Sequence, residues 1–269
     1  MGVLYHEGLI IKKTEFTYFY LDQGCVVGNR ATFSAEETRH LIKVCRVQAG
    51  DAISATDGNG CVYTIEIDDV SKTAVAGRIT DMVTLDREAT QCDLAVPAAS
   101  AQKTDWVIEK CTELGVSAFH LFACDRSTGR RIRENRIERC RRIAVSAIKQ
   151  SMRAFLPQFF SYEDLKSLAE LFSRYDLVLY GHLAEGSQEL RKALDSHTFK
   201  TALVLVGPEA GFTDGETRLL EDASAVPVSY GEHRLRMETA AIILAAFVLE
   251  SQQPSRSGVL PVLRHEGCS

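Results

Sequence analysis

The sequence lacks the features of several specialised classes of protein. No stretch approaches the roughly 18 consecutive apolar residues of a membrane-spanning helix, and residues 1–20 have charged positions where a signal peptide has its apolar core. The eight cysteines form no CxxC pair and no regular framework, a pattern typical of free thiols in a reducing compartment. We therefore expect a cytoplasmic protein with no membrane partner and no disulfides.

Motifs for the commonest nucleotide and metal sites are also missing. The chain has neither the GxGxxG dinucleotide fingerprint nor a P-loop, and its seven histidines lack the spacing of zinc ligands. The composition, with 45% hydrophobic and 25% charged residues, is that of an ordinary globular protein. The 269 residues suffice for one large or two modest domains, and we expect chemistry that uses no metal.

Positive charge is concentrated in one part of an otherwise acidic chain. The formal net charge is −5, but residues 126–153 hold ten Lys or Arg against Glu134 and Glu138, a net of +8. The rest of the chain therefore carries −13. A local basic segment on an acidic body indicates a site for a polyanion.

The first part of the chain has the pattern of a small β domain. Ser34 and Glu37 have the spacing of a capping box ahead of a helix near 35–46. Apolar and polar residues then form three strand-like segments, at 52–56, 61–68 and 74–83. Because the charged residues 86–88 end this pattern, we predict a first domain over residues 1–88.

The second part has the pattern of a parallel α/β domain, which we place at residues 89–252. Helical periods near 103–114 and 135–152 alternate with short apolar runs. The runs expected to form strands are 94–96, 118–123, 177–180, 203–206 and 226–228. A largely polar sequence with proline and glycine opens residues 253–269, which we expect to be a mobile tail.

The apolar run at 203–206 leads directly into a glycine-rich loop. Gly207 and Gly211 allow the backbone to approach a ligand closely, and Thr213 with Glu216 has the spacing of another capping box. In open parallel sheets, ligands bind beyond the carboxyl ends of the strands. This segment predicts a small-molecule site, with a purely structural turn as the alternative.

A second charged loop follows the apolar run at 226–228. Residues 230–240 place several charged side chains between that run and an apolar helix. We expect Arg236 and Glu238 to face each other or a ligand rather than solvent. A structural ion pair without a role in binding is the alternative.

Six segments of the chain carry a family resemblance. Two of them read Gly-Pro-Glu-Ala-Gly-Phe at 207–212 and Leu-Arg-Met-Glu-Thr-Ala at 235–240. The four others begin at His40, Glu109, Asp125 and Gln150. In this order they resemble the signature blocks of the RsmE family of 16S rRNA uridine-N3 methyltransferases, over residues 16–250. A single block would mean little, but six in order make a chance match very improbable.

The resemblance implies a PUA-like β-barrel followed by a SPOUT methyltransferase domain whose C-terminal loops form a trefoil knot. It also implies a homodimer that binds bent S-adenosylmethionine within the knot and acts on 16S rRNA of the small ribosomal subunit. The residues that would contact the cofactor are Val206, Gly207, Pro208, Glu209, Gly231, Leu235, Arg236, Thr239 and Ala240.

The chain departs from the family pattern at several positions. His233 stands where the family has an arginine, Lys149 where it commonly has a glutamate, and Ala210 where it has a glycine. The N-terminal arginine motif of the family is replaced by a segment whose nearest cations are Lys12 and Lys13. These differences concern RNA recognition more than cofactor binding.

Methylation at N3 of a uridine requires loss of the imide proton and stabilisation of negative charge on the base. Arg236 or Arg234 would stabilise the uracil oxygens, and Glu209 or His233 would accept the proton. The sequence leaves both choices open. A solvent-exposed His233 without a role, and Glu209 as an acceptor for loop amides, are the alternatives.

The basic segment would bind rRNA phosphates, which supply affinity without sequence information. The residues expected to do so are Arg126, Arg136, Arg139, Arg142 and Arg153. A solvated helix face is the alternative. For the whole protein, the rival functions are another SPOUT methyltransferase acting on tRNA or a ribose 2'-hydroxyl, and a non-catalytic RNA-binding assembly factor.

Overall fold

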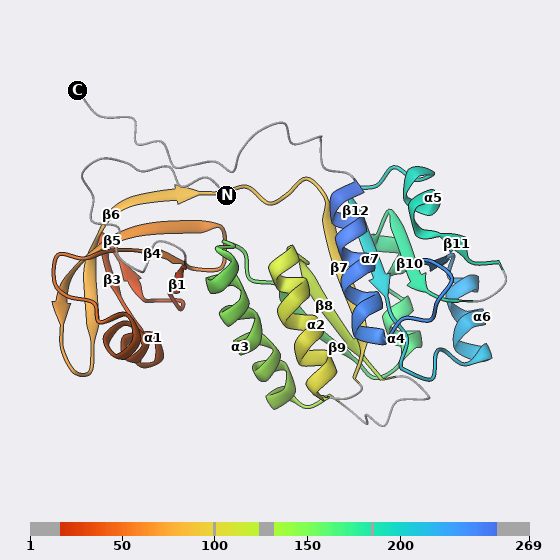
Figure 1. Cartoon of the computed structure of the whole chain (residues 1–269), viewed down its shortest axis with the longest axis horizontal. Coiled ribbons are helices and arrows are strands. Elements are labelled where there is room, and N and C mark those ends of the chain that lie inside the picture. Colours follow the sequence, from red (N-terminus) through yellow and green to blue (C-terminus); the bar gives the residue numbers. More distant parts are fainter. Residues whose placement is uncertain (1–16, 99–100, 124–131, 184–185, 252–269) are drawn as a thin grey trace.

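Two β-sheets lie in opposite halves of an elongated molecule (Figure 1). The structure is a computed structural model that describes residues 17–98, 101–123, 132–183 and 186–251. The segment predicted to be a mobile tail, 253–269, lies outside the described residues. The domain limits near residue 88 remain a prediction, with the last strand of the first sheet ending at Thr84 and the first strand of the second beginning at Gln91.

The N-terminal sheet has six strands in the order β1-β4-β5-β6-β3-β2. They are β1 Phe19–Tyr20, β2 Val26–Val27, β3 Arg30–Thr32, β4 Ala52–Thr56, β5 Cys61–Val70 and β6 Val75–Thr84. The pairing of β5 with β6 shifts register twice, and such bulges increase the twist of a sheet. Phe19, Ile53 and Ile65 are among the side chains buried in its core. The predicted strands of a small β domain are confirmed.

The helix predicted near 35–46 forms in two parts. The α-helix α1 covers Ala35–His40, and the π-helix η1 continues it over Leu41–Cys45. The Ser34 hydroxyl accepts a hydrogen bond from the Glu37 backbone amide, as the sequence predicted. The reciprocal half of the predicted capping box was wrong, because the Glu37 carboxylate pairs with the Lys149 ammonium instead.

The C-terminal sheet is parallel and has seven strands in the order β11-β13-β10-β12-β7-β8-β9. They are β7 Gln91–Pro97, β8 Ala118–Phe122, β9 Gln158–Tyr162, β10 Leu177–Gly181, β11 Gln188–Glu189, β12 Thr201–Leu205 and β13 Val226–Ser229. All five predicted strands are confirmed. The two edge strands, β9 and β11, were missed because strands with mostly exposed side chains carry no continuous apolar run.

Helices cover both faces of this sheet. The helices α2 Ala101–Leu114, α3 Glu134–Ser151, α5 Leu190–Asp195 and α7 Met237–Ser251 bury residues in one core cluster. The helices α4 Leu165–Ala169 and α6 Asp214–Asp222, with the 3-10 turn η2 Phe172–Arg174, pack on the other face. The parallel α/β prediction is confirmed, including the helices expected near 103–114 and 135–152. None of the helices within the described segments is long and apolar enough to span a membrane.

The end of α3 and the chain after it join the two halves of the molecule. The backbone amide of Gly60 donates to the Ala154 carbonyl over 2.9 Å, and the amide of Leu156 donates to the Gly58 carbonyl over 2.8 Å. A further link is the ion pair between Glu37 of α1 and Lys149 of α3, whose side chains have little solvent exposure. Since an ion pair with little solvent exposure breaks at high cost, these contacts fix the orientation of one half relative to the other.

Candidate functional site

Both loops singled out by the sequence lie at the carboxyl edge of the parallel sheet. The first follows β12 and the second follows β13, and β10 lies between these two strands. The Arg234 guanidinium donates a hydrogen bond to the backbone carbonyl of Glu209. The two loops are therefore joined across the end of β10, at the place where ligands bind in open parallel sheets.

The backbone of the first loop is tightly constrained. The Val206 amide continues the sheet by donating to the Ala95 carbonyl over 3.1 Å. A Cβ at Gly207 would lie 3.1 Å from the ring of Phe212, so only glycine fits without a shift. Gly211 has a φ of +75°, and its amide donates to the Pro208 carbonyl over 2.8 Å. The loop is thus pre-formed before any ligand binds.

The residues around this loop confirm the predicted start of α6. The Thr213 hydroxyl accepts from the Glu216 amide over 3.2 Å, and the Glu216 carboxylate accepts from the Thr213 amide over 2.7 Å. These two bonds are the reciprocal halves of a capping box. The loop is therefore held between two rigid elements, the strand β12 before it and the capped start of α6 after it.

A lysine that sequence reasoning missed reaches this loop from α2. The Lys103 ammonium, on the first turn of α2, lies 2.5 Å from a carboxylate oxygen of Glu209. This hydrogen bond lowers the pKa of the Glu209 carboxyl below its ordinary value. No sequence pattern links two residues that are 106 positions apart, and only the pairing of β7 with β12 brings them together.

The second loop presents four charged or titratable side chains to solvent, of which one is the carboxylate of Glu232. His233, Arg234 and Arg236 are exposed, while Gly231, with a φ of +67°, is also exposed at the turn. The predicted cofactor residues Leu235, Thr239 and Ala240 are half-buried. This loop therefore combines a partly apolar wall with a charged rim of two arginines, one histidine and one glutamate.

Of the two placements predicted for Arg236 and Glu238, a contact with each other was wrong, and a contact with a ligand stays a prediction. Arg236 faces solvent, whereas Glu238 is 8% exposed in the first turn of α7. Residues two positions apart at a helix start point to different sides, so one of these side chains is exposed and the other is buried. The buried Oε2 of Glu238 has no hydrogen-bond partner among the described residues.

The residue types of the two loops fit S-adenosylmethionine. The buried Val206 and Pro208 and the half-buried Leu235 supply apolar surface for an adenosine group. The unpartnered buried oxygen of Glu238 supplies an acceptor or negative charge, which suits a ligand with ammonium and sulfonium groups. Among the described residues, no cluster of three or more His, Cys, Asp or Glu is arranged to hold a metal ion.

Most of the arginines predicted to bind RNA already have carboxylate partners. Arg136 and Arg139 lie 2.7 Å and 2.6 Å from the carboxylate of Asp105 on α2. Arg153 lies 2.9 Å from Glu88. Arg142 is exposed and has no ion pair among the described residues, and Arg126 lies outside them. The charge of the basic helix is therefore partly neutralised within the protein.

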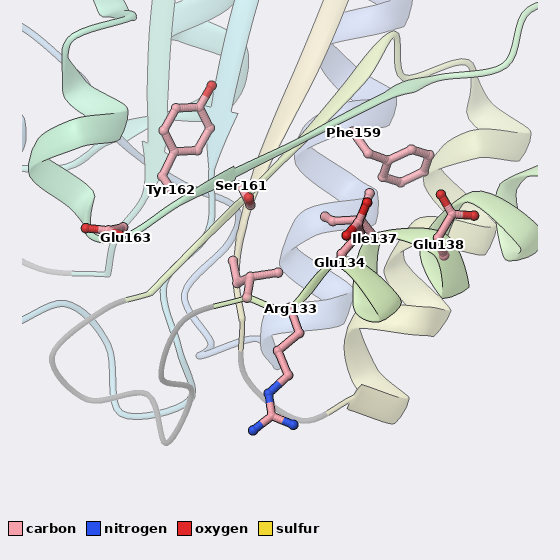
Figure 2. Close-up of a pocket in the computed structure, with 9 residues that line it drawn as sticks. Arg133, Glu134, Ile137, Glu138, Phe159, Ser161, Tyr162 and Glu163 are labelled. Atoms are coloured by element: carbon pink, nitrogen blue, oxygen red, sulfur yellow. The ribbon is translucent and has the colours of Figure 1, made fainter.

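A cavity of about 800 Å³ lies away from the two loops, between α3 and the edge strand β9 (Figure 2). Its wall combines the aromatic rings of Phe159 and Tyr162 with three carboxylates and one arginine. The carboxylates are those of Glu134, Glu138 and Glu163, and the arginine is Arg133. This excess of negative charge disfavours RNA phosphates at the cavity.

Comparison with protein families and relatives agrees with this organisation. Residues 86–249 match the RNA methyltransferase domain family, and residues 33–80 match the RNA methyltransferase PUA domain family. A protein of Bacillus subtilis named ribosomal RNA small subunit methyltransferase E is 30% identical over 78% of this chain and 87% of its own length. A Synechocystis protein of the same name is 28% identical over 82% of this chain and 73% of its own length.

Solved structures share the fold over nearly their whole length. A methyltransferase from Legionella pneumophila, described as putative and in complex with the bound cofactor SAM, superposes with a TM-score of 0.78 at 26% identity, covering 87% of this chain and 97% of that chain. Ribosomal RNA small subunit methyltransferase E of Neisseria gonorrhoeae, bound to S-adenosyl methionine, gives a TM-score of 0.73 at 26% identity, covering 86% and 96%.

Proposed function

Because the chain belongs to the RsmE family of RNA methyltransferases, we propose that it transfers a methyl group from S-adenosylmethionine to N3 of a uridine in 16S rRNA of the small ribosomal subunit. The observation that carries this proposal is the junction of the two signature loops through Arg234 and the Glu209 carbonyl, at the carboxyl edge of the sheet. Solved relatives of the same fold are described with S-adenosyl methionine bound.

The cofactor would lie between the two loops. Backbone groups from Val206 to Glu209 would bind its adenosine and methionine parts, while Leu235, Thr239 and Ala240 would close the opposite wall. When bound, it supplies a methyl group activated by a sulfonium. The remaining work of the protein is to orient the uracil, stabilise its charge and remove one proton.

Arg236 is the residue that we assign to charge stabilisation. Its guanidinium is exposed at the rim of the site, and its planar fork suits the oxygens of a uracil anion. Arg234 is already engaged with the Glu209 carbonyl. We therefore assign it to positioning the loops rather than to contact with the base.

His233 is the proton acceptor that we favour. Glu209 is held by Lys103, and the resulting fall in its pKa makes it a weak base at neutral pH. A neutral imidazole has a ring nitrogen that can accept a proton, and histidine is the side chain most often used for this role. The His233 imidazole would accept the imide proton of uridine.

We also propose that the protein is a cytoplasmic homodimer with a trefoil knot in its C-terminal loops. Exposed apolar side chains near the site support an interface, since Trp106 is 45% and Tyr230 is 43% exposed. The Tyr230 ring lies 5.3 Å from that of Phe247 on α7, so these rings would extend one apolar surface. The insertion of β13 between β10 and β11 is consistent with the crossing of chain that a knot requires.

The test is transfer of a labelled methyl group to isolated small ribosomal subunits under single-turnover conditions. Mass spectrometry of RNA digests would locate the methyl, with 3-methyluridine as the expected product. A methyl on ribose or on tRNA would support the rival methyltransferase. Cofactor binding without transfer to any RNA, or absence of binding by calorimetry, would favour an assembly factor.

A further inference from the structure

The strand β9 ends the parallel sheet, and no strand of the described residues pairs with its outer side. The Gln158 amide, at the start of β9, donates inward to the Ser117 carbonyl over 3.0 Å. Because alternate residues of a parallel strand turn their backbone groups toward the same neighbour, the N–H and C=O groups of Phe159 and Ser161 point away from β8. These two residues therefore offer donors and acceptors to an added strand.

The sequence of β9 does not protect this edge. Proteins commonly shield edge strands by short length, charged side chains, proline or bulges. The opposite edge strand, β11, follows this rule, since it consists only of Gln188 and Glu189. In contrast, β9 is 5 residues long, contains three aromatic residues and no charged one, and its Phe160 is 41% exposed. The edge is therefore suited to pairing with another chain.

A groove runs along β9, between this strand and α3. The cavity of about 800 Å³ shown in Figure 2 forms one part of it, and a second cavity of about 410 Å³ forms the other. The two cavities share Ile137, Glu138 and Phe159 in their walls, so they adjoin. When a peptide adds a strand to a sheet edge, main-chain hydrogen bonds give affinity and pockets for its side chains give specificity. This groove provides both.

The charges along the groove select a cationic strand. Glu134 and Glu138 on α3 and Glu163 after β9 are exposed in the first cavity (Figure 2). None of these three carboxylates forms an ion pair within the described part of the chain, and Arg133 is the one cation in that wall. The second cavity adds the charged residues Asp57, Arg87 and Arg141. The excess of negative charge in the first cavity repels phosphates and attracts lysine or arginine side chains.

We propose that β9 and this groove dock an extended, lysine- or arginine-rich segment of a partner protein, which joins the sheet as a further strand. Its main chain would pair with Phe159 and Ser161, and its basic side chains would reach the three carboxylates. In the sheet, β7 and β8 separate β9 from β12, whose loop belongs to the candidate cofactor site. The protein partner would therefore bind without occupying the methyl-transfer site.

The experiment measures fluorescence anisotropy of three labelled synthetic peptides with the full chain. In the first peptide lysine alternates with valine, in the second glutamate replaces lysine, and the third is the first with every backbone nitrogen methylated. Only the first should bind saturably, because the second has the wrong charge and the third has no amide hydrogen to donate.

Two variants test the two parts of the groove. Ser161→Pro removes an outward amide at an edge position, where proline is tolerated, and should lower affinity for the first peptide about tenfold. Glu134→Gln, Glu138→Gln and Glu163→Gln combined should also lower it about tenfold and weaken its salt dependence. The matched control removes the same charge at exposed positions elsewhere and should bind like wild type. It combines Glu36→Gln, Asp69→Asn and Asp195→Asn.

The outcomes that would overturn the proposal are distinct. They include no saturable binding of the first peptide, equal binding of all three, and wild-type affinity in the triple glutamine variant, whose melting temperature should match wild type. Weaker binding of a 16S rRNA transcript by Ser161→Pro would assign the groove to RNA instead. A lower mass of Ser161→Pro in sedimentation equilibrium would assign the edge to a second copy of the chain. Methylation activity enters none of these measurements, so failure of the proposed function would leave the docking site standing.

Discussion

The pair of Lys103 and Glu209 makes a prediction that can be checked without RNA. Replacing Lys103 with methionine removes the ammonium 2.5 Å from the carboxylate but keeps most of the apolar side chain. The two side chains are 35% and 47% exposed, so solvent screens the pair and its contribution to folding should be at most about 1 kcal/mol. For a chain of this size, the melting temperature should fall by only about 2 °C.

The pH dependence of this small loss of stability tests whether the ion pair of Lys103 and Glu209 causes it. The pKa of Glu209 is lowered in the folded state, so the stability that the pair contributes is present above the ordinary carboxyl pKa of about 4.3. It is lost as the pH falls through the lowered folded-state pKa. The melting temperatures of wild type and Lys103→Met should therefore differ near neutral pH and converge in acid.

Differential scanning fluorimetry across this range, on four proteins, gives the measurement. The four are wild type, Lys103→Met, Glu209→Gln and the double variant, and their melting temperatures form a double-mutant cycle. We expect a coupling energy of about 0.5–1 kcal/mol at neutral pH. A difference between wild type and Lys103→Met that persists unchanged in acid, or fully additive variants, would refute the pairing.

Three other outcomes follow from the structure. Arg236→Lys should lower single-turnover methylation by about a hundredfold to a thousandfold, because an ammonium lacks the planar fork, whereas near-normal turnover would remove the role of Arg236. Gly207→Ala should weaken S-adenosylmethionine binding in calorimetry, since the added methyl lies 3.1 Å from the Phe212 ring, and unchanged affinity would move the cofactor elsewhere. Lys149→Met should cost about 3–5 kcal/mol in urea denaturation by leaving the buried Glu37 carboxylate without its partner; a loss below about 1 kcal/mol would contradict that reasoning.

Local patterns in the sequence determined most of the secondary structure. The apolar runs and helical periods of the second half predicted five strands and two helices that the structure confirms. Thr213 and Glu216 form their capping box as predicted because both partners belong to one turn of chain. The two signature loops were also identified from sequence, since glycine and charged residues after a buried strand are a local signal.

Tertiary structure decided which partner each charged side chain has. Glu37 was expected to cap its own helix, but the folded chain places Lys149 beside it. Arg136 and Arg139 were expected to face RNA, and their pairing with Asp105 depends on the packing of α3 against α2. The energy of an ion pair depends on the distance between the two charges in the folded protein. The sequence therefore has no periodic pattern that identifies the partner of a charged residue.

The pair of Lys103 and Glu209 illustrates the same division between local and long-range information. The sequence by itself determined that a glycine-rich loop follows β12 and that a charged loop follows β13, because each depends on a few adjacent residues. Only the tertiary structure placed Lys103 against Glu209 and Arg234 against the Glu209 carbonyl. The physical reason is that parallel strands far apart in the chain must pair before the residues that follow them can meet at one edge of the sheet.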